Sequence, residues 1–187
     1  MNDAAEPLYQ RILILRCQAD DEQALGELIA RYSPGLRLFL AKLIGRGAGV
    51  DDLLQDTWLD VYRKINGLRN PEAFATWLYR IARDKAYREL RRRKITSRPI
   101  DDDLIEEPET DDEWFGPEDV DAVRAALDEI PPEQREVLML RFIEQMSYEQ
   151  IADVIARPIG TVRSRIHHAK LALRAKLDLK ANRKEIS

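Results

Sequence analysis

A stretch near the carboxyl end, residues 145–167, constrains the fold of this chain more than any other segment. Ser147 and Gln150 have the spacing of a capping box, in which two side chains satisfy free backbone N–H groups at the start of a helix. Pro158 fits the first turn of a second helix, where its missing N–H costs nothing. The stretch therefore predicts two short helices joined by a tight turn. This is the helix-turn-helix arrangement, whose second helix enters the major groove of DNA.

The second of these helices is expected to have one packed face and one outward face. Its apolar residues recur at helical spacing at Val162, Ile166, Ala169 and Leu173. The polar and basic residues that mostly lie off this stripe are Thr161, Arg163, Ser164, Arg165 and His168. A helical hairpin with a solvated basic face is the alternative. Ala156 occupies the turn, where a left-handed backbone would add strain of about 1 kcal/mol.

The net charge of −4 hides an uneven distribution of charge. Residues 101–121 hold twelve acids and no base, and without them the chain carries 30 bases against 22 acids. Residues 63–94 carry eleven Lys or Arg against three acids, and residues 157–176 carry six against none. Two basic regions separated by an acidic one predict two contacts with nucleic acid, attracted mainly by phosphate neutralisation.

Composition and spacing argue against several other classes of function. No apolar run approaches the roughly 20 residues that span a bilayer, and the amino terminus lacks a secretory pattern, so we expect a cytoplasmic protein without membrane insertion. Cys17 is alone, which excludes an internal disulfide and a cysteine-cluster metal site. His167 and His168 are adjacent on a helix and cannot both face one metal. No phosphate-cradling glycine loop is present, so we expect no catalysis, metal or cofactor.

The whole chain is expected to be all-α, because strand-like alternation persists nowhere. Cap spacing or proline predicts helix starts at Asp20, Ser33-Pro34, Asp52 and Asn70-Pro71. The crowded acids after residue 100 would repel one another in a helix and favour an extended linker. The predicted organisation is two small helical domains, residues 1–95 and 119–187, joined by an acidic linker at residues 96–118.

The segment from Asp51 to Arg63 combines an apolar stripe with an unusual outward surface. The stripe of Leu54, Trp58, Val61 and Ile65 provides the packing. The residues left toward the outside are Leu53, Gln55, Asp56, Asp60 and Arg63. An exposed leucine among hydrogen-bonding groups would suit a protein partner with a basic rim. An ordinary amphipathic helix is the alternative.

The helix expected after Pro71 mixes basic and aromatic side chains on one surface. Phe74, Leu78, Ile81, Ala82 and Leu90 would pack inward. The outward set is Arg80, Arg83, Tyr87, Arg88 and Arg91, with Trp77 and Tyr79 close by. Guanidinium groups track phosphates, and aromatic rings give unstacked bases a platform of about 1–3 kcal/mol each. The mixture suits an opened DNA strand, unless the aromatics belong to the core and the arginines form a solvated face.

Three stretches together closely resemble the sigma-70 family of bacterial RNA polymerase sigma factors, in its compact extracytoplasmic-function (ECF) subgroup. They are Asp51 to Arg63, Phe74 to Arg83, and Ile130 to Arg141 running on into Ser147 to Lys170. The resemblance implies two helical domains, called sigma domains 2 and 4. It also implies a non-catalytic subunit that binds core polymerase, recognises the −10 and −35 promoter elements and promotes DNA-templated transcription initiation.

The resemblance also assigns residues to partners. Leu53, Gln55, Asp56 and the neighbouring Asp60 would dock on the clamp helices of the polymerase β′ subunit. The −10 element would be read and opened by the loop from Lys64 to Asn70 and the helix from Phe74 to Arg93. The residues expected there are Lys64, Asn66, Asn70, Trp77, Arg80, Arg83, Tyr87, Arg88 and Arg91. The −35 element would contact Arg157, Thr161, Arg163, Ser164, Arg165 and His168, and the acidic linker would run toward the polymerase active-site and RNA-exit region.

Asp84 departs from the family, which often has asparagine there, so a base contact at that position requires Arg80, Lys85 or Arg88 to pair with the carboxylate. Two rivals remain open. A helix-turn-helix regulator that binds duplex DNA alone would not need the Asp51 to Arg63 surface. A pure interaction protein that sequesters such a factor or the polymerase would not need a basic recognition helix. The promoter sequence, the inducing signal and an anti-sigma partner also remain open.

Overall fold

The computed structural model describes residues 5–45, 49–93 and 120–185. These residues form helices and turns without a strand, and the chain divides into two compact units, residues 1–96 and 97–187. The all-α prediction with two helical domains is therefore confirmed. The predicted acidic linker lies outside the described residues.

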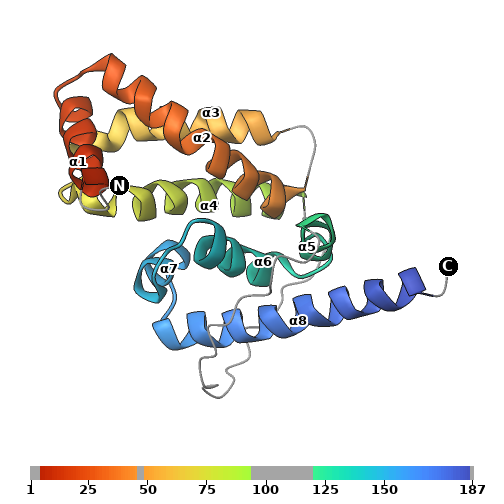
Figure 1. The fold of residues 1–187 in the computed structure, drawn as a ribbon. Helices are drawn as coiled ribbons and strands as arrows, with labels where there is room; N and C mark the ends of the chain where they lie inside the picture. The colour runs from red at the N-terminus through yellow and green to blue at the C-terminus, as the bar shows by residue number, and fades with distance from the viewer. Residues whose placement is uncertain (1–4, 46–48, 94–119, 186–187) are drawn as a thin grey trace. The chain divides into compact units, whose positions relative to one another are not determined.

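The amino-terminal unit is a bundle in which a long helix, α2, packs against three others (Figure 1). Its helices are α1 (Ala5–Gln18), α2 (Glu22–Ile44), α3 (Val50–Lys64) and α4 (Phe74–Arg93), with 3₁₀ turns η1 (Ile65–Gly67) and η2 (Pro71–Ala73) between the last two. Leu28, Leu36, Phe39, Leu78 and Ala82 are fully buried in the core. The Phe39 ring meets the buried Tyr79 ring edge-on at 5.2 Å between centroids.

Three predicted helix starts in this unit were wrong. Pro34 does not begin a helix but lies inside α2; apolar residues buried on both sides of it, such as Leu28 and Leu36, hold the two halves as one helix. The cap of α2 is Asp21 rather than Asp20, since its carboxylate accepts from the N–H groups of Gln23 and Ala24.

The third wrong start is that of α3. The helix begins at Val50, after Gly49 in a left-handed conformation (φ 113°), so Asp52 and Gln55 lie within the helix and do not cap it. The predicted start at Asn70-Pro71 is confirmed. The Asn70 side chain accepts from the N–H of Glu72, and η2 leads directly into α4.

The carboxyl-terminal unit contains a long helix, α8 (Ile159–Glu185), that packs against α5 (Val120–Leu127), α6 (Pro132–Leu138) and α7 (Tyr148–Ile155) (Figure 1). The last turn after α6, residues Met139–Ile143, is a π-helix, which is wider than the α-helix by one residue per hydrogen-bonded ring. The apolar stripe predicted for the recognition helix is buried at each of its four positions, Val162, Ile166, Ala169 and Leu173.

Candidate nucleic-acid and protein interfaces

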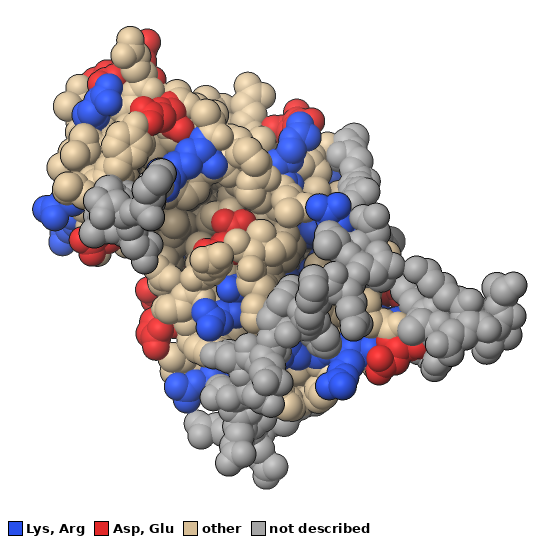
Figure 2. Space-filling model, in the orientation of Figure 1, with Lys and Arg blue, Asp and Glu red and all other residues tan. Residues whose placement is uncertain are grey.

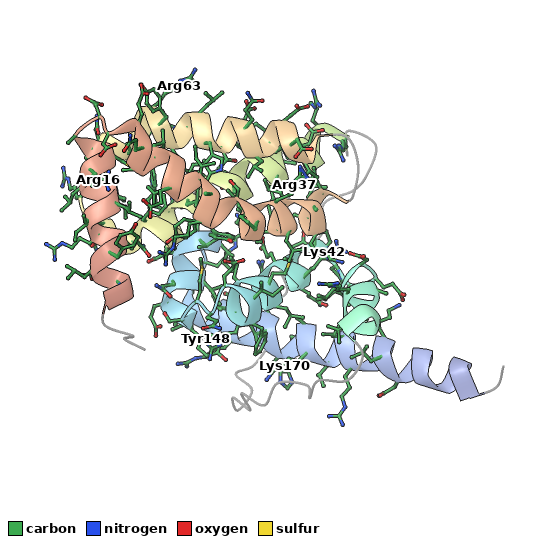
Figure 3. The ribbon with its side chains drawn as sticks, turned by 45° about the horizontal axis from the view of Figure 1, so that its top comes forward. Arg16, Arg37, Lys42, Arg63, Tyr148 and Lys170 are labelled. Atoms are coloured by element: carbon green, nitrogen blue, oxygen red, sulfur yellow. The ribbon has the colours of Figure 1, made fainter. Side chains whose placement is uncertain are left out.

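The outward surface of α3 carries the residues predicted to bind a protein partner. Thr57, Trp58 and Val61 are buried, and the Trp58 indole N–H donates to the Ser33 hydroxyl of α2 at 3.0 Å, which fixes the rotation of α3. This rotation leaves Gln55 and Asp56 exposed and Leu53 half-buried. Figure 3 shows Arg63 on the outer side of the same helix.

Asp60 differs from the other residues of this surface because it is already engaged. Its carboxylate lies 3.3 Å from Lys64 and 3.2 Å from Lys85 of α4, and its side chain is 24% exposed. Partial burial pushes the pKa of Asp60 upward, but the hydrogen bonds from Lys85 and Lys64 outweigh it and lower the pKa below its ordinary value. Asp60 therefore joins α3 to α4 in addition to lining the predicted surface.

A cleft between α3 and α4 brings the two predicted surfaces of this unit together. Asp52, Leu53 and Asp56 line it from α3, and Lys85, Arg88 and Arg92 line it from α4. Acids on one wall thus face bases on the other. The protein-binding and nucleic-acid-binding residues predicted from the sequence meet at this cleft.

The loop between α3 and α4 is held by a residue that the sequence did not single out. The Gln18 side-chain amide, at the end of α1, donates to the carbonyls of Ile65 at 2.9 Å and Leu68 at 2.8 Å. These bonds fasten both sides of η1, while Asn66 within it remains exposed. A glutamine ending a helix has no local signature of such a role, because its partners lie 47 and 50 residues away.

The aromatic residues predicted on α4 have different environments. Tyr79 is only 1% exposed and belongs to the core, so the alternative interpretation holds for this ring. Trp77 is half-buried beside the buried Phe74 ring, 6.1 Å between centroids, and keeps part of its surface outside. Tyr87 is also half-buried and lies under the Arg83 guanidinium, 4.4 Å from the ring centroid.

The arginines of α4 form an outward row at Arg80, Arg88 and Arg91, which are all exposed. Asp84 does not pair with any of the residues considered from the sequence, at the distances found here. Its carboxylate lies 4.0 Å from Arg83. Figure 2 shows lysine and arginine side chains interspersed with acidic and uncharged ones on the face that it displays, so the bases are spread along the helices.

The helix-turn-helix of the second unit has the predicted local geometry. The Ser147 hydroxyl accepts from the N–H of Gln150, and the Gln150 side chain accepts from the N–H of Ser147 at 2.8 Å, so the capping box is confirmed. Ala156 has φ 52° and ψ 50°, the left-handed conformation expected at the turn. The helix begins at Ile159, and Pro158 provides the carbonyl for its first hydrogen bond.

The outward face of α8 contains most of the residues predicted to meet duplex DNA. Arg157 and Arg163 are exposed, and Thr161 and Ser164 are half-buried. The Ser164 hydroxyl donates to the carbonyl of Thr161 at 3.1 Å. His168 is half-buried, and its Nε2 atom is covered. Nearby, Lys170 of α8 lies over the Phe142 ring at 5.6 Å and Arg141 over the Tyr148 ring at 5.3 Å (Figure 3).

Arg165 is placed differently from these neighbours. Its side chain is 13% exposed and lies 3.8 Å from the carboxylate of Glu136 in α6, which is fully buried. Periodicity could have indicated this, since Arg165 comes three residues after Val162 and four before Ala169 on the packed side of the helix. The sequence reading treated it as outward because of its charge.

Neither a metal cluster nor a membrane-spanning helix is found among the described residues. No group of three or more histidine, cysteine or acidic side chains in that part of the chain is arranged to hold a metal ion. None of the described helices is both long enough and apolar enough to cross a bilayer.

Family models match both units. Residues 28–95 match "Sigma-70 region 2" and residues 121–173 match "Sigma-70, region 4". The chain is 32% identical over 186 residues to the ECF RNA polymerase sigma-E factor of Haemophilus influenzae, covering 92% of this chain and 97% of the relative. It is 31% identical over 181 residues to that of Escherichia coli, covering 90% and 94%.

Solved structures resemble the fold as well. The sigma factor RpoE of Bartonella quintana, solved with the anti-sigma factor NepR, has a TM-score of 0.62 and 26% identity, with 82% of this chain and 96% of that chain covered. CnrH, solved with the cytosolic domain of CnrY, has a TM-score of 0.64 and covers 91% of this chain and 97% of that one. At 23% identity, this second likeness concerns the fold alone.

Proposed function

Because this chain belongs to the ECF sigma factors of the sigma-70 family, we propose that it directs core RNA polymerase to promoters through the surfaces described above. It is a promoter-recognising sigma factor. The observation that carries the proposal is the presence, in one chain, of a sigma region 2 unit and a sigma region 4 unit, each with its own basic helix.

The contact with polymerase is assigned to α3. Gln55 and Asp56 are exposed and Leu53 is half-buried at the mouth of the cleft, which suits docking on the clamp helices of β′. Asp60 contributes by holding Lys85 and Lys64, so its part in docking is to fix α3 against α4.

The −10 contact is assigned to the loop after α3 and to the outer side of α4. Lys64 and Asn66 are exposed on the loop, while Asn70 shapes it by capping η2. Arginines along α4 would follow the phosphates of the opened strand, and the half-buried rings would stack against unpaired bases. The residues proposed on α4 are Trp77, Arg80, Arg83, Tyr87, Arg88 and Arg91.

The −35 contact is assigned to the helix-turn-helix. Arg157 and Arg163 are exposed where a recognition helix meets phosphates and base edges. Thr161, Ser164 and His168 lie on the flank of the same face. Arg165, which the sequence placed in this group, has a different environment and is considered below.

The chain is a specificity factor of transcription initiation, and we infer that all of the chemistry resides in the polymerase. Acting on DNA with polymerase places its work in the cytoplasm. We further propose that an anti-sigma factor binds it, since the Bartonella quintana relative was solved with one. Such a partner would cover the polymerase-binding or DNA-binding surfaces.

Run-off transcription tests the proposal. Purified chain is added to sigma-free core polymerase with fragmented genomic DNA, and transcript ends are sequenced. We expect initiation from a small set of sites that share −10 and −35 elements. No chain-dependent start site would refute the function. Retention of DNA binding with no pull-down of core polymerase would instead indicate a regulator that binds duplex DNA alone.

A further inference from the structure

We propose that Glu136 is a positioning residue for −35 recognition: its buried carboxylate holds Arg165, so that Arg165 orients α8 instead of contacting DNA. The inference deepens the proposed function and rests on it. It concerns two side chains that lie in one unit, on α6 and α8.

Helix geometry separates Arg165 from the arginine that faces outward. Successive residues of an α-helix are rotated by about 100°, so Arg163 and Arg165 point about 200° apart. Arg163 is exposed, whereas Arg165 is 13% exposed and flanked along the helix by the fully buried Val162 and Ala169. An arginine on that side of a recognition helix faces its own domain.

The partner of Arg165 explains why a charged side chain is found there. Glu136 is 0% exposed, and a carboxylate removed from water requires a compensating cation or hydrogen bonds. The Arg165 guanidinium, 3.8 Å away, provides opposite charge. The adjacent Arg135 donates to the carbonyls of Asp128 at 3.0 Å and Ile130 at 2.8 Å, and so secures the turn that precedes α6.

This pair fixes α8 at a point where apolar packing alone specifies little. Valine, isoleucine and alanine side chains set the distance between α6 and α8, but they tolerate small rotations and sliding of one helix along the other. An ion pair with a buried carboxylate allows one register. Because Arg163 is two residues before Arg165, the direction of Arg163 follows from that register.

Salt dependence distinguishes the two roles of an arginine. Each phosphate neutralised by a basic side chain adds about 0.9 to the slope of log affinity against log salt. A positioning arginine changes affinity without changing that slope. The experiment uses full-length chain assembled with core polymerase and a promoter duplex that passes the run-off assay, with affinity measured at several salt concentrations.

Four variants are compared with the wild type: Arg163→Met, Arg165→Met, Glu136→Gln, and the last two combined. We expect Arg163→Met to reduce the slope by about one. Arg165→Met and Glu136→Gln should each lower affinity on the order of tenfold, with the wild-type slope. The combined variant should lose no more than either single one, because all three remove the same pair.

Control and refuting results follow from the same measurements. Glu129→Gln removes the surface contact with Lys176, 3.4 Å, that also joins α8 to its unit, and should bind as the wild type does. A slope reduced by about one in Arg165→Met, or wild-type affinity in Glu136→Gln, overturns the inference. If a single variant unfolds in circular dichroism, the combined one, which leaves no unpaired buried charge, still reports the slope. Failure of the wild type to bind any promoter refutes the proposed function instead.

Discussion

Replacing Gln18 with alanine should loosen the loop that we assign to −10 recognition. The Gln18 amide donates two hydrogen bonds, at 2.9 Å and 2.8 Å, to carbonyls on either side of η1. A typical intramolecular hydrogen bond contributes about 0.5–1.5 kcal/mol net, so losing both should lower the free energy of unfolding by about 1–3 kcal/mol. If the loop must be ordered to capture bases, promoter opening should weaken by about five- to 150-fold, the same energy expressed as an equilibrium.

Two measurements test this expectation in parallel. Urea unfolding followed by circular dichroism gives the loss of stability, and permanganate reactivity of unpaired thymines gives the open fraction of a promoter. Gln23→Ala is the matched control, because Gln23 is exposed and only its backbone N–H bonds to Asp21. An unfolding free energy unchanged by Gln18→Ala, or lowered equally by both substitutions, would refute the reasoning. Lost stability with unaltered opening would separate the loop from melting.

Three further predictions concern single side chains. Asp56→Arg should weaken core-polymerase binding by about tenfold or more, because it puts a like charge opposite a basic partner; equal loss of −35 fragment binding would argue against separate surfaces. Ala156→Gly should raise the stability of the second unit by about 1 kcal/mol in thermal unfolding, because φ is 52° there; a decrease would contradict the strain. Asp60, whose pKa is lowered by Lys85 and Lys64, stabilises the fold above the ordinary carboxyl pKa and loses this contribution as pH falls through its own. The stability difference between wild type and Asp60→Asn should therefore shrink on acidification below about pH 4, and a difference that grows would show the opposite sign.

Local signals predicted the parts of the structure that depend on near neighbours in the chain. The Ser147–Gln150 capping box, the left-handed Ala156 and the Asn70 cap each involve residues at most three apart, so spacing alone was sufficient. Where tertiary packing competes with a local signal, the packing prevails. Pro34 reads as a helix start, yet buried side chains on both sides keep it within α2.

The binding surfaces were harder to predict because charge does not state direction. Gln55, Arg80 and Arg163 are outward as expected. Arg165 is equally basic but lies against Glu136, a partner 29 positions earlier that no local pattern indicates. Gln18 depends in the same way on carbonyls distant in sequence.

The π-helical turn at Met139–Ile143 carries one residue more than a regular helix of the same span. Deleting any one residue there would restore ordinary geometry but rotate everything downstream by about 100°. Glu136 comes before the turn and Arg165 after it, so the deletion would bring the two out of alignment. Chain length at this spot, more than side-chain identity, thus decides which way the DNA-reading helix faces, and insertions or deletions here should be far less tolerated than substitutions.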